Sequence, residues 1–350
     1  ALKQSSAFYD ISNSQVIRSI FCSVSPAIVQ KVYHLNNIVY TIEKSNSNKL
    51  QNGHILLGEI LPMYAAILAM RTIDYGGIKP TDENQVRLCI ILSFAQIYSG
   101  VLLYNQILEF NNWLCSEYKI DIPKDWVGFT VSPSFIEYFE RPQLISIRIN
   151  QGKMIPLSSS DLERPPIFTN SINNNLPLFI DELKVIHPQI LPPLHITQLL
   201  VMSKQNIIIH GPMDSGKSSF LHIVFANMKN IEPIIINASC YTNSELVTNY
   251  LCNHTTLISK SKNRSVINKN YILVFDGIDK SHIELMEVIR MLITQHSIPR
   301  FSPNDQKVFE FSKLVNFSVI VTTRCYNELP SRFLSCFAPV SLSSISETTA

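Results

Sequence analysis

Residues 207–218 contain the feature that most restricts how this chain can fold. Ile207-Ile208-Ile209-His210 is an apolar run with the length and composition of a buried strand. It leads directly into Gly211–Ser218, which has the spacing G-x-x-x-x-G-K-S, and helical sequence follows over residues 219–228. Strand, glycine-bearing loop and helix in this order predict a phosphate-binding loop within a parallel α/β sheet.

Each residue type in this loop suits phosphate binding. Glycines allow backbone N–H groups to approach phosphate oxygens closely, and the helix N-terminus adds a partial positive charge. Lys217 predicts an ammonium on the β- and γ-phosphates, and Ser218 predicts a hydroxyl ligand for Mg²⁺. The predicted nucleotide-binding residues are Gly211, Pro212, Met213, Asp214, Ser215, Gly216, Lys217, Ser218 and Ser219. A loop that matches the pattern by chance is the alternative, and the flanking strand and helix argue against it.

A second apolar run ends in an acid. Residues 271–275 are Tyr-Ile-Leu-Val-Phe, and Asp276 follows them. A carboxylate at the end of such a strand holds Mg²⁺ in P-loop enzymes, which is the Walker B form. Many core strands end in Asp at a turn, so the run is informative because it accompanies the loop. Ser218 and Asp276 are therefore the predicted metal ligands, with ATP or ADP and Mg²⁺ as the predicted cofactors.

A third apolar run, Phe317–Thr323, ends in two threonines. In nucleotide-hydrolysing sheets this strand often lies between the two strands already described, and its polar end faces the attacking water or the γ-phosphate. Thr323 is the residue predicted for that contact. The strand pattern alone supports equally well a threonine pair that only begins a loop.

Composition excludes several other classes of protein. Hydrophobic residues make up 46% of the chain and charged residues 16%, so the chain can bury large cores and is not disordered by composition. A formal net charge of +2 gives no reason to expect a nucleic acid partner. The seven cysteines form no C-x-x-C pair, which suits reduced thiols in the cytosol better than zinc or disulfides. Residues 88–104 are apolar but shorter than the ~20 residues of a membrane span, so we expect a buried helix and no membrane partner.

The chain is expected to have three regions. Residues 1–120 read as a helical, lid-like region, residues 121–190 as an irregular connector with short strands, and residues 191–350 as the P-loop domain, truncated before its own lid. Apolar periodicity predicts helices over Ser14–Phe21, Pro26–Val39, Gly53–Arg71 and Asp82–Leu114. Leu144–Ile149 predicts a strand in the connector. The absence of an initial methionine and the unfinished final segment lead us to expect a fragment.

The order of these motifs, followed by Arg332-Phe333, resembles an AAA+ module, and more narrowly the dynein heavy chain motor ring. Ile236-Asn237-Ala238-Ser239 is similar to the dynein strand after the P-loop helix, and residues 283–289 resemble the helix after its Walker B strand. Residues 92–114, with Trp126 after them, resemble the approach to a dynein module boundary. The likeness covers about residues 80–345, across the end of the second module and most of the third.

The resemblance implies an α/β P-loop NTPase of the AAA+ kind, a parallel sheet with flanking helices, preceded by a mainly α-helical lid-like region. It also implies a trans-acting arginine at Arg332, where the second arginine of that pattern is Ser335. AAA+ enzymes follow the Walker B Asp with a second acid, and here Gly277 takes that place and cannot act as a base. Asp279 is the nearest acid that could replace it. An acid at Asp214, where the family has Gly, could repel phosphate.

These features lead us to expect a nucleotide-binding segment of a dynein-like microtubule motor, regulatory and with weak or no hydrolysis. A free-standing AAA+ ATPase or signalling NTPase is one alternative, and a degenerate ring segment that binds nothing is another. The resemblance implies neighbouring AAA+ modules of the same heavy chain and dynein accessory chains as partners. Microtubules would be reached indirectly, through regions outside this chain. It also implies a cytoplasmic location on the cytoskeleton, with a ciliary or flagellar axoneme as one possibility.

Overall fold

The computed structural model describes residues 15–36, 56–122, 144–157, 190–226, 228, 231–239, 242–257, 263–265, 270–279, 282–301, 308–324 and 326–342. The chain divides into two compact units, residues 1–203 with 338–350 and residues 204–337. The predicted division into regions 1–120, 121–190 and 191–350 stays a prediction, and Trp126 and most of the predicted connector lie outside the described residues.

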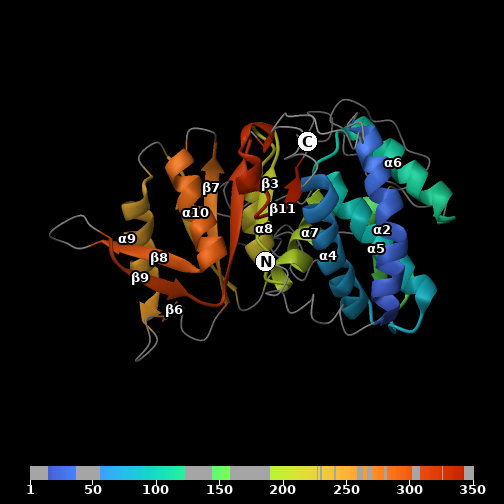
Figure 1. Cartoon of the computed structure of the whole chain (residues 1–350), viewed down its shortest axis with the longest axis horizontal. Coiled ribbons are helices and arrows are strands. Elements are labelled where there is room, and N and C mark those ends of the chain that lie inside the picture. Colours follow the sequence, from blue (N-terminus) through green and yellow to red (C-terminus); the bar gives the residue numbers. More distant parts are fainter. Residues whose placement is uncertain are drawn as a thin grey trace, which may run out of the picture. The chain divides into compact units, whose positions relative to one another are not determined.

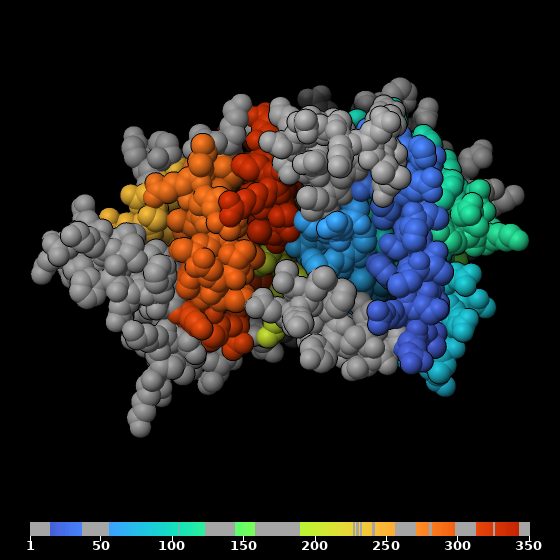
Figure 2. Space-filling view, in the orientation of Figure 1, coloured from blue at the N-terminus to red at the C-terminus, as the bar shows by residue number. Residues whose placement is uncertain are grey.

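The first unit is mainly helical. Its helices are α2 (Gln15–Leu35), the π-helix η1 (Leu56–Ile60), α4 (Leu61–Tyr75), α5 (Glu83–Ser99), α6 (Tyr104–Glu117), the 3₁₀ turn η2 (Leu144–Ser146) and α7 (Leu191–Met202). Its strands are the antiparallel pair β1 (Ile147–Asn150) and β2 (Lys153–Pro156), together with β11 (Ala338–Ser341). Helices α2, α4 and α5 lie side by side (Figure 1), and Figure 2 shows α2, in blue, on the surface of this unit.

The core of the first unit forms around α5. Phe94 and Tyr98 are fully buried on this helix, and the Tyr98 hydroxyl donates to the Leu57 carbonyl at 2.6 Å. Phe110 of α6 packs against Tyr98 with ring centroids 6.0 Å apart. The helix begins where the sequence predicts, because the Asp82 side chain accepts a hydrogen bond from the Gln85 N–H and so caps it.

Two helix predictions in this unit are wrong. The helix predicted over Asp82–Leu114 is two helices, since α5 ends at Ser99 and α6 begins at Tyr104. Gly100 comes close to the backbone of Pro339, and a Cβ built there would lie 2.4 Å from the Pro339 carbonyl oxygen. The second wrong prediction concerns α2. The sequence predicted two helices, Ser14–Phe21 and Pro26–Val39, but α2 runs through Pro26 as one continuous helix.

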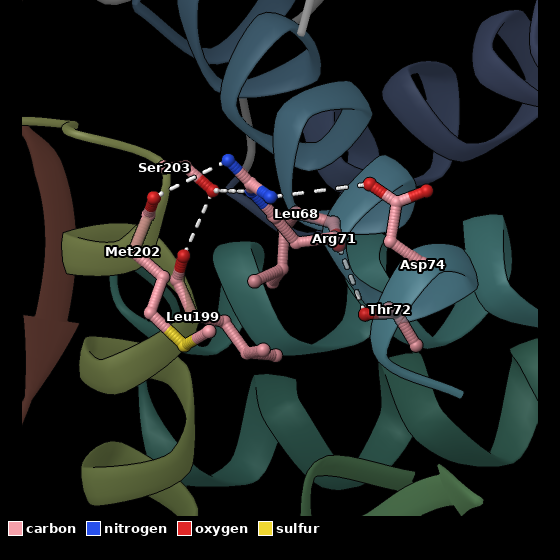
Figure 3. Close-up of polar contacts among 7 residues, drawn as sticks. All are labelled: Leu68, Arg71, Thr72, Asp74, Leu199, Met202 and Ser203. Atoms are coloured by element: carbon pink, nitrogen blue, oxygen red, sulfur yellow. Dashed lines mark hydrogen bonds and ion pairs between the residues drawn. The ribbon is translucent and has the colours of Figure 1, made fainter. Parts of the chain in front are cut away.

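Helix α7 is buried on nearly every side and begins with Pro192 and Pro193 in its first turn, where proline's missing N–H leaves no helical hydrogen bond unmade. Its C-terminal end is capped by a basic side chain from α4. Arg71 donates to the Met202 carbonyl at 3.3 Å and to the Ser203 hydroxyl at 3.1 Å (Figure 3). A cation at a helix C-terminus also interacts favourably with the helix dipole.

One helical segment, Leu56–Tyr75, is long and apolar enough by length and composition to cross a membrane, and 67% of that window is buried within the structure. The core helix of a globular protein meets the same test. Of the apolar residues 88–104, residues 88–99 belong to α5, which is buried along most of its length, as predicted. Residues 100–103 lie between α5 and α6, and Leu103 is exposed.

The second unit contains the predicted α/β fold. Its elements are β3 (Ile207–His210), α8 (Lys217–Ala226), β4 (Ile231–Asn237), α9 (Ser244–His254), β5 (Thr256–Leu257), β6 (Asn263–Ser265), β7 (Asn270–Ile278), α10 (Ile283–Gln295), β8 (Ser297–Phe301), β9 (Val308–Leu314), β10 (Phe317–Thr323), η7 (Tyr326–Glu328) and α11 (Ser331–Leu334). Strands β5, β6, β9 and β8 form a separate four-stranded sheet that the sequence did not predict.

The main sheet has five strands in the order β11-β3-β10-β7-β4 (Figure 1). The pairs β3–β10, β10–β7 and β7–β4 are parallel. Strand β10 therefore lies between β3 and β7, as the sequence predicts, and this is the order of an AAA+ P-loop sheet with flanking helices. Residues 272–275 of β7 are almost completely buried, which fits a parallel sheet covered on both faces.

Candidate nucleotide-binding site

The loop between β3 and α8 adopts a conformation that its sequence allows. Gly216 has φ +71 and Asp214 has φ +64, both in the left-handed region that glycine and, less readily, Asp or Asn adopt. Helix α8 begins at Lys217, and the Phe220 N–H bonds the Gly216 carbonyl at 2.8 Å in its first turn. The loop thus leads straight into a helix N-terminus, as the motif requires.

Lys217 lies over the loop that precedes it. Its ammonium donates to the Gly211 carbonyl at 3.0 Å, to the Pro212 carbonyl at 2.6 Å and to the Ser215 hydroxyl at 3.2 Å. Burial lowers the pKa of Lys217, and the charge of Asp276 raises it in part. These contacts fix the ammonium at the mouth of the loop, the position that the motif assigns to phosphate contact.

The two predicted metal ligands meet directly. Ser218 donates its hydroxyl hydrogen to Asp276 Oδ2 at 2.8 Å, although 58 residues separate them in the sequence. Both contribute oxygen, the ligand that Mg²⁺ prefers, and both lie beside Lys217 in the same cavity. The residues present therefore fit a Mg²⁺–nucleotide, in which Ser218 and Asp276 would hold the metal and Lys217 would hold phosphate.

Strand β10 supplies a polar side chain next to Asp276. The Thr322 hydroxyl bonds Asp276 Oδ1, the carboxylate oxygen that Ser218 does not use, and it accepts the Gly277 N–H at 2.8 Å. Thr323, the residue predicted for this role, is also buried and lines the cavity, and its carbonyl accepts the Gly211 N–H at 3.3 Å. Thr322 is thus a site residue that the sequence analysis missed.

Gly277, which follows Asp276, has a backbone conformation that suits glycine. Its φ is +87, and the pairing of β7 with β10 is irregular between Val321 and Thr323, beside this residue. A Cβ added at Gly277 would meet no atom closer than 4.0 Å. The obstacle to a side chain here is therefore the backbone angle and not lack of space.

The remaining predicted catalytic residues lie outside the cavity lining. Asp279 Oδ1 lies 2.8 Å from Nδ1 of His282, the residue that precedes the first turn of α10. Arg332 is exposed on α11, where its charge helps to lower the pKa of Glu287, after the hydrogen bond and charge of Arg290. The catalytic role of Asp279 and the trans-acting role of Arg332 stay predictions.

The cavity has a volume of about 490 Å³ and opens at the carboxyl ends of the sheet strands. It is lined by Met213, Asp214, Gly216, Lys217, Ser218, Ser219, Asn237, Asp276, Gly277, Ile278, Thr322, Thr323 and Arg324. Three predicted binding residues do not line the cavity and instead accept hydrogen bonds from the Lys217 ammonium: Gly211, Pro212 and Ser215. Asn237 and Arg324 were not predicted as site residues. Each lies at the end of a strand next to β7 or β3, so the strand-end rule that identified Asp276 could have found them.

Comparison with known proteins found no matching family model and no matching curated protein. Among solved structures, the chain is similar to a RuvB mutant from Thermotoga maritima, with 13% identity, a TM-score of 0.33, and 47% of this chain and 48% of that chain covered. It is also similar to NtrX from Brucella abortus in complex with ADP, with 16% identity, a TM-score of 0.33, and coverage of 47% and 37%. A second RuvB mutant gives 16% identity, a TM-score of 0.31 and 48% coverage of each chain. Each alignment spans less than half of the solved chain.

Proposed function

We propose that the chain binds a Mg²⁺–nucleotide, ATP or ADP, in the cavity at residues 211–219 and Asp276. The observation that carries the proposal is the 2.8 Å hydrogen bond from Ser218 to Asp276, with the Lys217 ammonium beside it. A hydroxyl, a strand-end carboxylate and an ammonium in one cavity are the set that a metal-bound di- or triphosphate needs.

Hydrolysis at this site is proposed to be slow or absent. A general base or water-positioning acid is needed to orient the attacking water. Gly277 has no side chain to do so, and Asp279 is engaged with His282 instead of lining the cavity. The nucleotide would then act as a structural or regulatory ligand that favours one conformation of the module over another.

The finer proposal is that the chain is a segment of a dynein-like motor ring within the AAA+ family. It rests on the sequence resemblance around Ile236–Ser239, residues 283–289 and Arg332-Phe333. Its partners would be adjacent AAA+ modules and dynein accessory chains, with microtubules bound through other regions. The location would be the cytoplasmic or axonemal cytoskeleton.

The test is nucleotide binding by the 350-residue chain, with Lys217→Ala compared with Lys313→Ala. Lys313 is exposed on β9 and does not line the cavity, so its loss controls for net charge. We expect Mg²⁺–ATP or Mg²⁺–ADP binding in the wild type and in Lys313→Ala, strongly reduced binding in Lys217→Ala, and ATP turnover near background.

Two other outcomes are informative. Absence of binding in a folded wild-type chain would overturn the proposal and support a degenerate ring segment. Brisk turnover would overturn the regulatory role and support a free-standing ATPase, with a residue other than Gly277 orienting the water.

A further inference from the structure

The candidate cavity carries an unusual balance of charge for a phosphate site. Four charged side chains line it: the cations Lys217 and Arg324 and the carboxylates Asp214 and Asp276. Their formal charges cancel. One carboxylate, Asp276, has a role as the metal ligand, so the charge that needs an explanation is that of Asp214.

Asp214 places a negative charge within the phosphate loop itself. It is exposed at φ +64 and lines the cavity, and its charge raises the pKa of Lys217, so the two groups interact. A carboxylate in this place attracts the lysine but repels a polyphosphate. A loop with this residue therefore needs positive charge from elsewhere to bind phosphate as well as a loop with glycine does.

Arg324 is placed to supply that charge. It directly follows β10, its side chain is exposed, and it lines the same cavity. Within the described part of the chain its guanidinium has one contact, to Met213 Sδ of the loop at 3.9 Å, and a thioether is only a weak acceptor. The charge of Arg324 also lowers the pKa of Lys217, so the two cations are close enough to interact electrostatically.

We propose that Arg324 is a second phosphate-binding side chain of this cavity, acting in cis, and that it offsets the repulsion from Asp214. A guanidinium presents several N–H donors in a planar fork that matches phosphate oxygens, so it suits this task better than an ammonium does. The inference rests on the proposed nucleotide site. It assigns to Arg324, which directly follows β10, a phosphate contact that the sequence motifs did not predict for this residue.

The experiment measures binding of Mg²⁺–ATP, Mg²⁺–ADP and Mg²⁺–tripolyphosphate to the 350-residue chain and its variants. Loss of a charge-assisted hydrogen bond predicts about tenfold weaker binding of Mg²⁺–ATP by Arg324→Gln, with part of the affinity kept in Arg324→Lys. Tripolyphosphate has no base, so an equal loss for that probe locates the contact on the phosphates.

A double-mutant cycle tests the pairing with Asp214. Asp214→Asn keeps a residue that tolerates positive φ and removes the charge, so we expect tighter binding than in the wild type. The double variant Asp214→Asn with Arg324→Gln should return close to wild-type affinity. Arg290→Gln is the matched control, since Arg290 pairs with Glu287 on α10 outside the cavity lining, and it should bind as the wild type does.

The outcomes separate the two proposals. If the folded wild type binds none of the three probes, the proposed function fails, and this inference fails with it. If the wild type binds and Arg324→Gln binds equally well, the proposed function stands and the role of Arg324 is overturned. Thermal melting of each variant, equal to that of the wild type, shows that a loss of affinity is not a loss of fold.

Discussion

Thr322 bonds Oδ1 of Asp276 and Ser218 bonds Oδ2, so each oxygen of this carboxylate has a hydroxyl partner. The Thr322 hydroxyl also accepts the Gly277 N–H at 2.8 Å. It therefore joins the ends of β10 and β7 and fixes the orientation of the candidate metal ligand. Groups that orient a metal ligand in this way affect metal affinity although they do not touch the metal.

Thr322→Val should weaken the Mg²⁺ dependence of nucleotide binding. Removing the hydroxyl frees Asp276 Oδ1 and leaves the Gly277 N–H without this acceptor, and loss of such an orienting partner typically lowers metal affinity about 10- to 100-fold. A Mg²⁺ titration at fixed nucleotide concentration measures the effect. Thr322→Ser keeps the hydroxyl and should stay near wild type, and an unchanged titration in Thr322→Val would refute the role assigned to this residue.

Gly277→Glu should not create an active ATPase. At φ +87 any residue with a Cβ is strained, and we expect Gly277→Ala to lower the free energy of unfolding by about 1–2 kcal/mol. The glutamate variant should have a similar loss of stability, and turnover should stay near background. Denaturant unfolding and steady-state turnover are the measurements, and a glutamate variant with wild-type stability and rapid turnover would contradict the prediction.

Nucleotide binding should weaken as the pH rises through the lowered pKa of Lys217. The ammonium binds phosphate only when protonated, and burial moves its pKa below the usual value. Because the unfolded chain holds this proton to higher pH than the folded one, the group's contribution to the free energy of unfolding rises with pH between the two pKa values. Affinity measured from pH 7 upward tests the first effect. Any binding that remains in Lys217→Arg should be independent of this titration, since a guanidinium stays protonated.

Gly100→Ala should destabilise the first unit. The residue has φ −72, so its backbone accepts alanine without strain, but the new methyl group would lie 2.4 Å from the Pro339 carbonyl oxygen. Overpacking of this kind costs about 1–3 kcal/mol. Gly77→Ala is a useful comparison, because a Cβ there meets no atom within 4 Å and only the positive φ of +62 is unfavourable. Equal stability of Gly100→Ala and wild type would show that β11 moves away at no cost.

The central α/β elements were predictable because their signals are local. The apolar runs before Gly211, before Asp276 and up to Thr323 each form the strand that the sequence indicates, and β10 lies between β3 and β7 as predicted. Thr322 was missed because alternation along a strand places neighbouring residues on opposite faces but does not say which face meets Asp276. The irregular pairing opposite Gly277, visible only in the folded sheet, decides it.

The helices of the first unit were predicted less well than the strands of the second. Apolar residues continue through Gly100–Leu103 without a break in periodicity, so the sequence predicts one helix where the structure has two. Helix α5 ends at its C-cap Gly100, so a local signal was present but was outweighed by the apolar pattern around it. The close approach of Pro339 to Gly100, which comes from a distant part of the sequence, could not be predicted.

The chain passes from one compact unit to the other twice, after Ser203 and after Phe337, since residues 338–350 return to the unit formed by residues 1–203. The P-loop unit is thus an insertion with two covalent attachments. A protease cut at Ser203–Lys204 would leave β11, which packs against α5 and α7, as part of the downstream fragment. The two fragments should therefore remain associated after cleavage, and separately expressed halves should complement each other through that one strand.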